Sequence, residues 1–402
     1  MRKLLIIILL LVSCLRVAAQ GGLDYSVRGK VVDAGSGRPV AAVSVAVQGK
    51  GFSTVTNVDG SCVIKSSSPI RELVFSHIGY RETRRKADGG ELMVMLPPVA
   101  YPLPEASLVS GDPREILGEA IKAIADNYPS EPELLHCFYR ETLQKRQRYI
   151  AVNEAVARIY KMPYKHRSVR ADKTALEKSR IIISQRKRDT LSVRIMGGPT
   201  LAANFDPVKN PDIIFNDVDL PLYNFEMEAP AYIGDRLQFV ISFYPALDAE
   251  YPLYRGMAYI DRETLAFSRV ELSMDVSDKA KATRVILVRK PMGLRFTPKE
   301  MTITVTYRQE GGVMRMDYFR SSLSFNCDWR KHLFATSYVA VNELVVTDLV
   351  KPAVPIGRDE VFRPTDVLDD KAPLFLDPDF WKDYNIIEPS ESLEHAVSRL
   401  RK

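Results

Sequence analysis

The sequence predicts a mainly β protein, with an N-terminal seven-strand β-sandwich followed by a larger antiparallel β-meander and a few helices. Two observations lead to this fold class. Short apolar runs alternate with polar residues along most of the chain, and turn-forming Gly, Asp and Pro residues separate them. Many of these runs are consecutive and joined by short turns, which is typical of a meander. Such a sheet buries one face economically when it curves, and a curved half-barrel is one form that it takes.

Residues 1–20 are typical of a targeting segment. Arg2 and Lys3 supply the positive start, Leu4 to Val12 form an apolar run, and Val17 to Ala19 form a small-residue cleavage site. The apolar run is shorter than the roughly 20 residues that span a bilayer. We therefore expect an exported protein, either periplasmic or associated with the outer membrane.

A second interpretation of the same segment concerns Cys14. Leu11 to Cys14 fit a lipobox, in which Cys14 would be lipidated and become the first residue of a lipoprotein. Leu15 and Arg16 follow it, and an ordinary cleavage site comes next, so the sequence leaves both forms of export open.

Residues 26–97 carry the pattern of a small sandwich. Val43, Val45 and Val47 alternate with polar or small residues, Asp59-Gly60 is a strong turn dipeptide, and residues 73–76 form a short apolar strand. The predicted core comprises Val43, Val45, Val47, Ile64, Leu73, Phe75 and Leu96.

The order of motifs in this stretch is G-K-V-x-D, G-x-P-V, V-x-V, T-x-x-D-G and L-V-F-S-x-I-G-Y. From Ser26 to Leu96 it resembles the carboxypeptidase-regulatory-like domain, a prealbumin-like seven-strand sandwich. Such domains occur behind signal peptides in Gram-negative outer-membrane systems, including the N-termini of TonB-dependent transporters. The resemblance implies an interaction or spacer module and not a peptidase. Cys62 stands where the family usually has an aromatic residue, and we expect it to be a small buried apolar side chain.

Residues 98–112 are Pro-rich and predict a stiff linker. A helix is expected to begin at Asp112-Pro113, because Asp caps helices and Pro is tolerated in the first turn. Ile116, Ala120 and Ile124 continue an apolar stripe along it.

Residues 113–350 are predicted to form this helix and a large antiparallel sheet. Strands are expected in residues 134–160, 236–243, 257–260, 265–274, 283–288, 301–307, 314–325 and 339–346. The hairpin at Gly256 to Asp261, with Thr264, is similar to one in lipoprotein-carrier half-barrels.

Residues 351–402 form a Pro-rich, acidic tail that ends in a helix predicted over residues 392–400. The motif F-W-x-x-Y-N-I-I at residues 380–387, together with F-Y-R-E at 138–141, resembles exported proteins that pair the regulatory-like sandwich with an uncharacterised C-terminal domain. That resemblance implies no particular activity.

The sequence lacks the motifs of common enzymes. None of the five histidines is followed three residues later by a carboxylate, and H-E-x-x-H, G-x-S-x-G and both phosphate-binding glycine motifs are absent. His136 and Cys137 are adjacent, but neighbours on a strand point to opposite faces. We therefore predict no catalytic residues, no cofactor and no metal site. Cys62, Cys137 and Cys327 are expected to be separate buried thiols.

Two charged regions are candidate sites. Asp206, Asp212, Asp217 and Asp219 lie in a loop without calcium-site spacing, which favours capping and turn formation. Ten basic residues lie between Lys161 and Arg188, and a solvated loop and strand edge explains them most simply. The alternative is contact with an anionic lipid surface, carried by Arg186, Lys187 and Arg188.

The sequence thus predicts a non-enzymatic, exported envelope protein, with an interaction or spacer sandwich and a β-rich domain that binds a partner or ligand. Expected partners are an envelope protein or outer-membrane component and an anionic lipid surface. The modest net charge of +6 does not require nucleic acid, and an exported protein would not meet it. Two alternatives remain: a half-barrel carrier of lipid or lipoprotein, and a hydrolase with scattered catalytic residues. A dry concave cavity favours the carrier, and convergent polar groups in a cleft favour the hydrolase.

Overall fold

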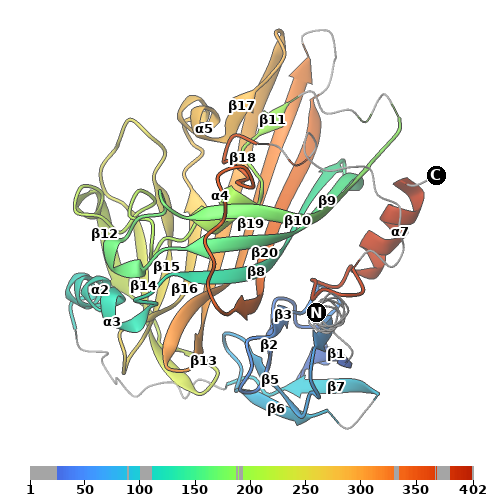
Figure 1. The fold of residues 1–402 in the computed structure, drawn as a ribbon. Coiled ribbons are helices and arrows are strands. Elements are labelled where there is room, and N and C mark those ends of the chain that lie inside the picture. The colour runs from blue at the N-terminus through green and yellow to red at the C-terminus, as the bar shows by residue number, and fades with distance from the viewer. Residues whose placement is uncertain are drawn as a thin grey trace, which may run out of the picture.

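The computed structural model describes residues 25–87, 90–99, 111–186, 189, 193–329, 335–366, 368 and 381–400. The targeting segment, most of the linker and part of the tail lie outside these residues, so the predicted domain boundaries there remain predictions. Figure 1 shows the sandwich at one end of the molecule and the large sheet above it, with the C-terminal helix beside both.

The N-terminal sandwich consists of seven strands in two sheets, as predicted. One sheet has the order β4 (Ser61–Ser66), β1 (Tyr25–Asp33), β7 (Glu91–Leu96). The other has the order β3 (Ser53–Val55), β2 (Ser44–Val47), β5 (Glu72–Ser76), β6 (Thr83–Lys86). All seven predicted core residues and Cys62 are buried between the sheets.

The short strands of the sandwich and their turns favour antiparallel pairing, but the sandwich is not wholly antiparallel. β1 and β7 pair in parallel, with Val31 opposite Val94. These are the first and last strands of the domain, so the second sheet supplies the long connection that a parallel pair needs.

The large sheet has eleven strands, and every pair in it is antiparallel. In chain order the strands are β8 (Glu133–Lys145), β9 (Arg148–Lys161), β10 (Lys173–Ile183), β12 (Tyr223–Met227), β13 (Ala231–Ile233), β14 (Arg236–Pro245), β15 (Tyr254–Asp261), β16 (Phe267–Met274), β18 (Leu294–Glu310), β19 (Val313–Trp329) and β20 (Thr336–Val350).

The sheet is a meander with one long-range junction. Its order is β10-β9-β8-β20-β19-β18-β16-β15-β14-β12, with β13 also on β14. The last strand, β20, therefore pairs with the first, β8, and joins the two hairpin series into one surface. Figure 1 shows the strand direction turning strongly between β8–β10 and β18–β19, so the sheet is twisted and open.

Side chains alternate between the two faces of the sheet. Cys137 and Tyr139 point to the face covered by helices, whereas Phe138 between them points to the other. The helix-covered face carries α2 (Pro113–Lys122), α3 (Ile124–Asn127), α4 (Pro199–Asn204) and α5 (Lys279–Ile286), with short turns η2 (Tyr164–His166) and η4 (Leu220–Leu222).

The predicted first helix is confirmed. Asp112 caps it by accepting a hydrogen bond from the backbone N–H of Arg114 at 2.8 Å, and Pro113 occupies the first turn. The strand predicted over residues 283–288 was wrong. Those residues lie mainly in α5, because Asp278 accepts hydrogen bonds from the N–H groups of Ala280 and Lys281. Strand pairing resumes at β17 (Leu287–Arg289), which pairs with β11 (Arg194–Ile195).

The tail packs on the opposite face and ties the two domains together. Trp381 lies edge-on against Phe138, and Asn385 pairs with the backbone of Lys65 in the sandwich through two hydrogen bonds. The predicted C-terminal helix is present as α7 (Glu391–Leu400), and it packs on β9 and β10. None of the helices in the described ranges is both long and apolar enough to cross a bilayer.

Candidate functional site: an apolar cleft on the large sheet

Two hollows in the described part of the chain are candidates for a binding site. One lies between the sandwich and the large sheet and has a volume of about 550 Å³. The other lies on the helix-covered face of the large sheet and consists of two adjoining cavities of about 420 and 110 Å³. Small-molecule sites in proteins commonly occupy roughly 300–1,000 Å³, so size alone does not separate them.

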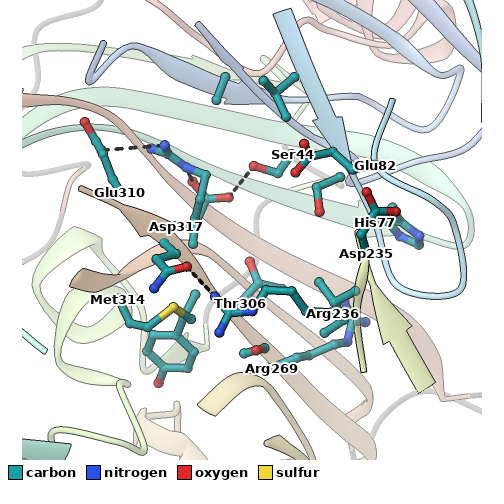
Figure 2. A pocket seen from close by; sticks show the side chains of 18 of the residues that line it. Ser44, His77, Glu82, Asp235, Arg236, Arg269, Thr306, Glu310, Met314 and Asp317 are labelled. Carbon is teal, nitrogen blue, oxygen red and sulfur yellow. Dashed lines mark hydrogen bonds and ion pairs between the residues drawn. The ribbon is translucent and has the colours of Figure 1, made fainter. Parts of the chain in front are cut away.

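The interdomain pocket is lined by charged side chains from both domains (Figure 2). Arg236 pairs with Asp261 at 2.6 Å, and Arg308 pairs with Asp317 at 3.0 Å. Ser44 of the sandwich donates a hydrogen bond to Asp317 at 2.7 Å, across the domain boundary. Because these cations are neutralised by adjacent carboxylates, the charges in the pocket are balanced, and the hydrogen bond from Ser44 to Asp317 links the two domains.

His77 lies at one side of this pocket (Figure 2). Burial, together with the positive charge of Arg269, lowers its pKa to about 4. One ring nitrogen, Nδ1, lies 2.9 Å from the carbonyl oxygen of Ile78. The imidazole is therefore neutral near pH 7, and its pKa lies far from the value that favours proton transfer at that pH.

The second hollow lies beneath residues 193–204, which we call the covering segment. This segment contains β11 and α4 and crosses the sheet over β8, β20 and β19 (Figure 1). The two adjoining cavities, together termed the apolar cleft, share the lining residues Ile195, Met196, Gly197, Gly198, Leu201, Ala340 and Asn342.

We call the cavity of about 110 Å³ the inner cavity and the one of about 420 Å³ the outer cavity. The inner cavity is lined almost wholly by apolar side chains. Ser321 and Asn342 are its polar exceptions besides Tyr254, and they are hydrogen-bonded to each other at 3.2 Å. Phe205, Met274, Ile286, Met301, Ile303, Phe319 and Leu323 form much of the remaining wall.

The inner cavity lies between two core clusters of the same sheet face. Ile303 and Phe319 belong to the larger cluster, whereas Ile286 and Leu323 belong to the cluster beneath α5. Protein interiors are normally packed to near-crystalline density. An apolar space between two packed clusters favours an apolar occupant, because its walls offer water few hydrogen-bond partners.

The outer cavity has a more polar mouth, where the covering segment is attached to β8. The N–H of Gly198 donates to the hydroxyl of Tyr139 at 2.9 Å, and that hydroxyl donates to Glu141 at 2.8 Å. Gly198 has a φ of 97°, which side-chain-bearing residues rarely adopt. Thr200 of α4 donates to the carbonyl oxygen of Phe362, so the covering segment is attached at two points.

A buried ionic network in the same core was not predicted from the sequence. Asp206, assigned to loop capping, is fully buried and accepts hydrogen bonds from Lys161, Tyr164 and Tyr307 at 2.8, 2.6 and 2.7 Å. Burial opposes its ionisation, but Lys161 and the hydroxyls hold the pKa of Asp206 below its usual value. Lys209, three residues on, pairs with Asp172 at 2.6 Å, and burial lowers its pKa to about 8. Lys161, Asp206 and Tyr307 are far apart in the sequence, so no local pattern predicted that they meet.

The cysteine predictions are confirmed for the described residues. Cys62, Cys137 and Cys327 are buried and free, and burial raises the pKa of Cys137 well above its usual value. His136 lies on the opposite face, 3.4 Å from Glu177, so the adjacent pair does not form a dyad. Within the described ranges, no three metal-ligating side chains come together.

The basic residues between Lys161 and Arg188 are dispersed. Lys161 is buried beside Asp206, and Arg180 pairs with buried Glu154 at 2.5 Å, so neither is part of a solvated edge. Arg186 is exposed. Lys187, Arg188 and Cys14 lie outside the described residues, so the anionic-surface contact and the lipidation remain predictions.

Comparison with protein families identifies the sandwich. The family model of the CarboxypepD_reg-like domain matches residues 27–93, which confirms the resemblance inferred from the motifs. The match lies wholly within the sandwich. A comparison of the chain with curated proteins found no match.

Comparison with solved structures gave weak similarities to the larger part of the chain. A DUF1329 family protein from Desulfovibrio piger covers 59% of this chain and 94% of its own, at 11% identity and a TM-score of 0.24. A LolA superfamily protein from Nitrosomonas europaea covers 61% and 99%, at 11% identity and a TM-score of 0.20. A protein of unknown function from Bacteroides fragilis covers 81% of this chain and 98% of its own, at 11% identity and a TM-score of 0.15. Scores this low establish no shared ligand or activity.

Proposed function

We propose that this chain is a non-enzymatic cell-envelope protein whose large sheet binds an apolar chain, such as an acyl group, in the apolar cleft. The observation that carries the proposal is the inner cavity between the two core clusters, with its apolar wall and its opening to the outer cavity. A hydrolase would need convergent polar groups at the same place. The two polar residues in the inner wall are instead hydrogen-bonded to each other, with Asn342 donating to Ser321.

The outer cavity suits the polar end of such a ligand. Its mouth carries Glu141, Asn153, Thr365 and Asp366, whereas its floor is continuous with the apolar wall through Ala340. An amphipathic molecule would therefore place its apolar chain inward and its polar end at the mouth. This polarity favours an acyl ligand over a wholly apolar one.

The sandwich fits the role of an interaction or spacer domain in this proposal. It has its own core and lies at the end of the molecule away from the covering segment (Figure 1). Export remains a prediction from residues 1–20. Replacing Cys14→Ala moves the protein from the membrane fraction to the soluble fraction if Cys14 is lipidated. N-terminal mass spectrometry of the mature protein distinguishes this from cleavage before Gly21.

Ligand binding is tested by titrating the protein with a dansylated undecanoic acid and following its emission. Wild type is expected to bind it with micromolar affinity and to shift the emission to the blue. Ala340→Met adds side-chain volume to both cavities, because Ala340 lines both, and is expected to weaken binding at least tenfold.

The matched control is Ala34→Met, at an exposed turn of the sandwich. It is expected to bind as wild type does. Equal affinities of wild type and Ala340→Met, with both variants folded by circular dichroism, would place the probe elsewhere and contradict the proposal. An alternative function, carriage of lipid or lipoprotein between membranes, uses the same cleft and differs in that the ligand must also be released.

A further inference from the structure

A second surface lies around α5 and β17, beside the mouth of the apolar cleft. Four apolar side chains are exposed there: Met196, Val285, Val288 and Met292, with 45%, 38%, 61% and 98% of their surface accessible. Single exposed apolar residues are common on proteins, but this group comes from adjoining elements. β11 pairs with β17, and the N–H of Met196 donates to the carbonyl oxygen of Ile286 at 2.9 Å. We call these four residues and the basic residues around them the α5 patch.

The α5 patch is basic as well as apolar. Residues 279–295 contain six Lys or Arg residues and no Asp or Glu. Lys281 is paired with Asp248, and Arg284 donates to the backbone carbonyl of Glu250. Within the described ranges, Arg284, Arg289 and Lys290 form no ion pair with a carboxylate, and all three are exposed.

The local structure points these side chains outward. In α5 the buried residues Ala282 and Ile286 face the sheet, which leaves Arg284 exposed and Val285 partly exposed at the edge of the inner cavity. After β17, residues 291–293 form a turn in which Gly293 has a φ of 81°. Met292 is therefore held at the tip of that turn, almost fully exposed.

The α5 patch is continuous with the apolar cleft. Met196 and Val285 line the inner cavity, and Met196 and Val288 line the outer one. An apolar chain that leaves or enters the cleft would therefore pass beside exposed apolar side chains. The sandwich lies at the opposite end of the molecule (Figure 1), so it would stay clear of anything that covers this patch.

We infer that the α5 patch docks on a lipid bilayer with anionic headgroups. Apolar side chains that insert at the headgroup level, surrounded by basic residues, are the features by which peripheral proteins bind such surfaces. The charge complementarity commits the patch to an anionic bilayer, and the adjoining cleft gives the docked protein direct access to acyl chains. This access to acyl chains rests on the proposed function, whereas the docking itself does not.

Docking is tested with residues 21–402, which contain every described element, and vesicles of phosphatidylcholine with or without 30 mol% phosphatidylglycerol. Flotation should recover the protein with the anionic vesicles and not with the neutral ones. Raising the salt concentration from about 0.1 to about 1 M should release it, because the screening length falls from about 10 to about 3 Å.

Two variants separate the contributions. Arg284→Ser/Arg289→Ser/Lys290→Ser is expected to lower binding roughly a hundredfold, the change that three near-surface basic residues would produce. Met292→Ser removes the exposed tip without touching the cleft lining and is expected to lower binding several-fold. Met292→Cys, labelled with an environment-sensitive dye, should shift its emission to the blue on anionic vesicles only.

Matched controls come from the sandwich. Arg71→Ser/Arg85→Ser/Lys86→Ser removes the same charge from exposed positions, and Met93→Ser removes an exposed methionine from β7. Both should bind vesicles as wild type does. Equal losses of vesicle binding in the patch and control variants would overturn the inference. It would also be overturned if the protein did not bind vesicles but formed a dimer that Met292→Ser abolished.

The dansylated acid distinguishes the two proposals. All patch variants above should still bind it in solution, because none of the substituted residues lines the cleft. Vesicle docking without binding of the acid would contradict the proposed function and leave docking intact. Binding of the acid without vesicle docking would contradict the docking proposal and leave the proposed function intact.

Discussion

The indole ring of Trp381 packs edge-on against the ring of Phe138, with centroids 5.6 Å apart. The indole N–H also donates to Glu154 at 3.0 Å, and Arg140 donates to the carbonyl oxygen of Ile387 at 2.7 Å. Residues 138–141 and 381–387, which carry most of the two motifs, are thus one packing unit. This unit fastens the tail to the face of the sheet that the apolar cleft does not use.

Trp381→Phe is expected to lower the free energy of unfolding by about 1–3 kcal/mol, because buried Glu154 loses one of its donors. Trp381→Ala should cost about 3–5 kcal/mol, since it also leaves a cavity. Urea denaturation followed by circular dichroism measures both. Limited proteolysis should cut residues 381–400 faster in the alanine variant, and unchanged cleavage would show that the tail is held elsewhere.

The buried pair of Lys161 and Asp206 gives a second prediction. Asp206→Leu leaves the buried ammonium group of Lys161 without its carboxylate partner and should lower the free energy of unfolding by about 3–5 kcal/mol. Lys161→Met/Asp206→Leu removes both charges and should cost clearly less than the two single variants added together. A double-mutant cycle in urea measures the difference, and strict additivity would show that the two groups do not interact.

The pH dependence of this pair has a definite sign. The folded-state pKa of Asp206 lies below its usual value of 3.8. Its contribution to stability is therefore present above about pH 4 and is lost as the pH falls through the folded-state value. The loss should be absent from the Lys161→Met/Asp206→Leu variant.

His77 makes the stability depend on pH over a different range. Its pKa falls from 6.5 in the unfolded chain to about 4 in the folded one, because burial and Arg269 disfavour its charged form. As the pH falls from 6.5 to 4 the unfolded state binds the proton first, so stability decreases, by roughly 3 kcal/mol over the window. His77→Gln should flatten this decrease in urea unfolding measured at several pH values. A wild-type slope in the variant would assign the titration to another group.

The sandwich should fold without the rest of the chain, because its core is separate from that of the large sheet. Residues 25–99 expressed alone are expected to unfold cooperatively. The fragment should be less stable than the same domain in the full chain, since Thr54 and Lys65 lose their tail partners Ile386 and Asn385. A broad, non-cooperative melt would contradict its independence.

The local patterns in the sequence were sufficient for much of the fold. Alternation at Val43, Val45 and Val47 predicted the buried face of β2, and Asp112-Pro113 predicted the start of α2, because both signals act within a few residues. α5 was missed because Thr283 to Val288 are rich in β-branched residues, while the deciding cap, Asp278, stands outside that run.

The candidate site could not be predicted in the same way. Ala340 and Met196 come together only because β20 returns to pair with β8 and the covering segment crosses that junction. Asp206 looked like its loop neighbours until long-range packing placed it beside Lys161 and Tyr307. Both depend on contacts distant in sequence, which periodicity does not encode.

Whether the apolar cleft holds an acyl chain is tested most directly by anomalous diffraction from crystals grown with a terminally brominated fatty acid. The expected result is a bromine peak in the inner cavity, among Ile286, Phe319 and Leu323, with the carboxylate at the mouth of the outer cavity. The peak should be absent from crystals of Ala340→Met. A bromine peak in the interdomain pocket beside His77 would contradict the proposed function. So would the absence of any ordered ligand from the cleft at saturating concentration.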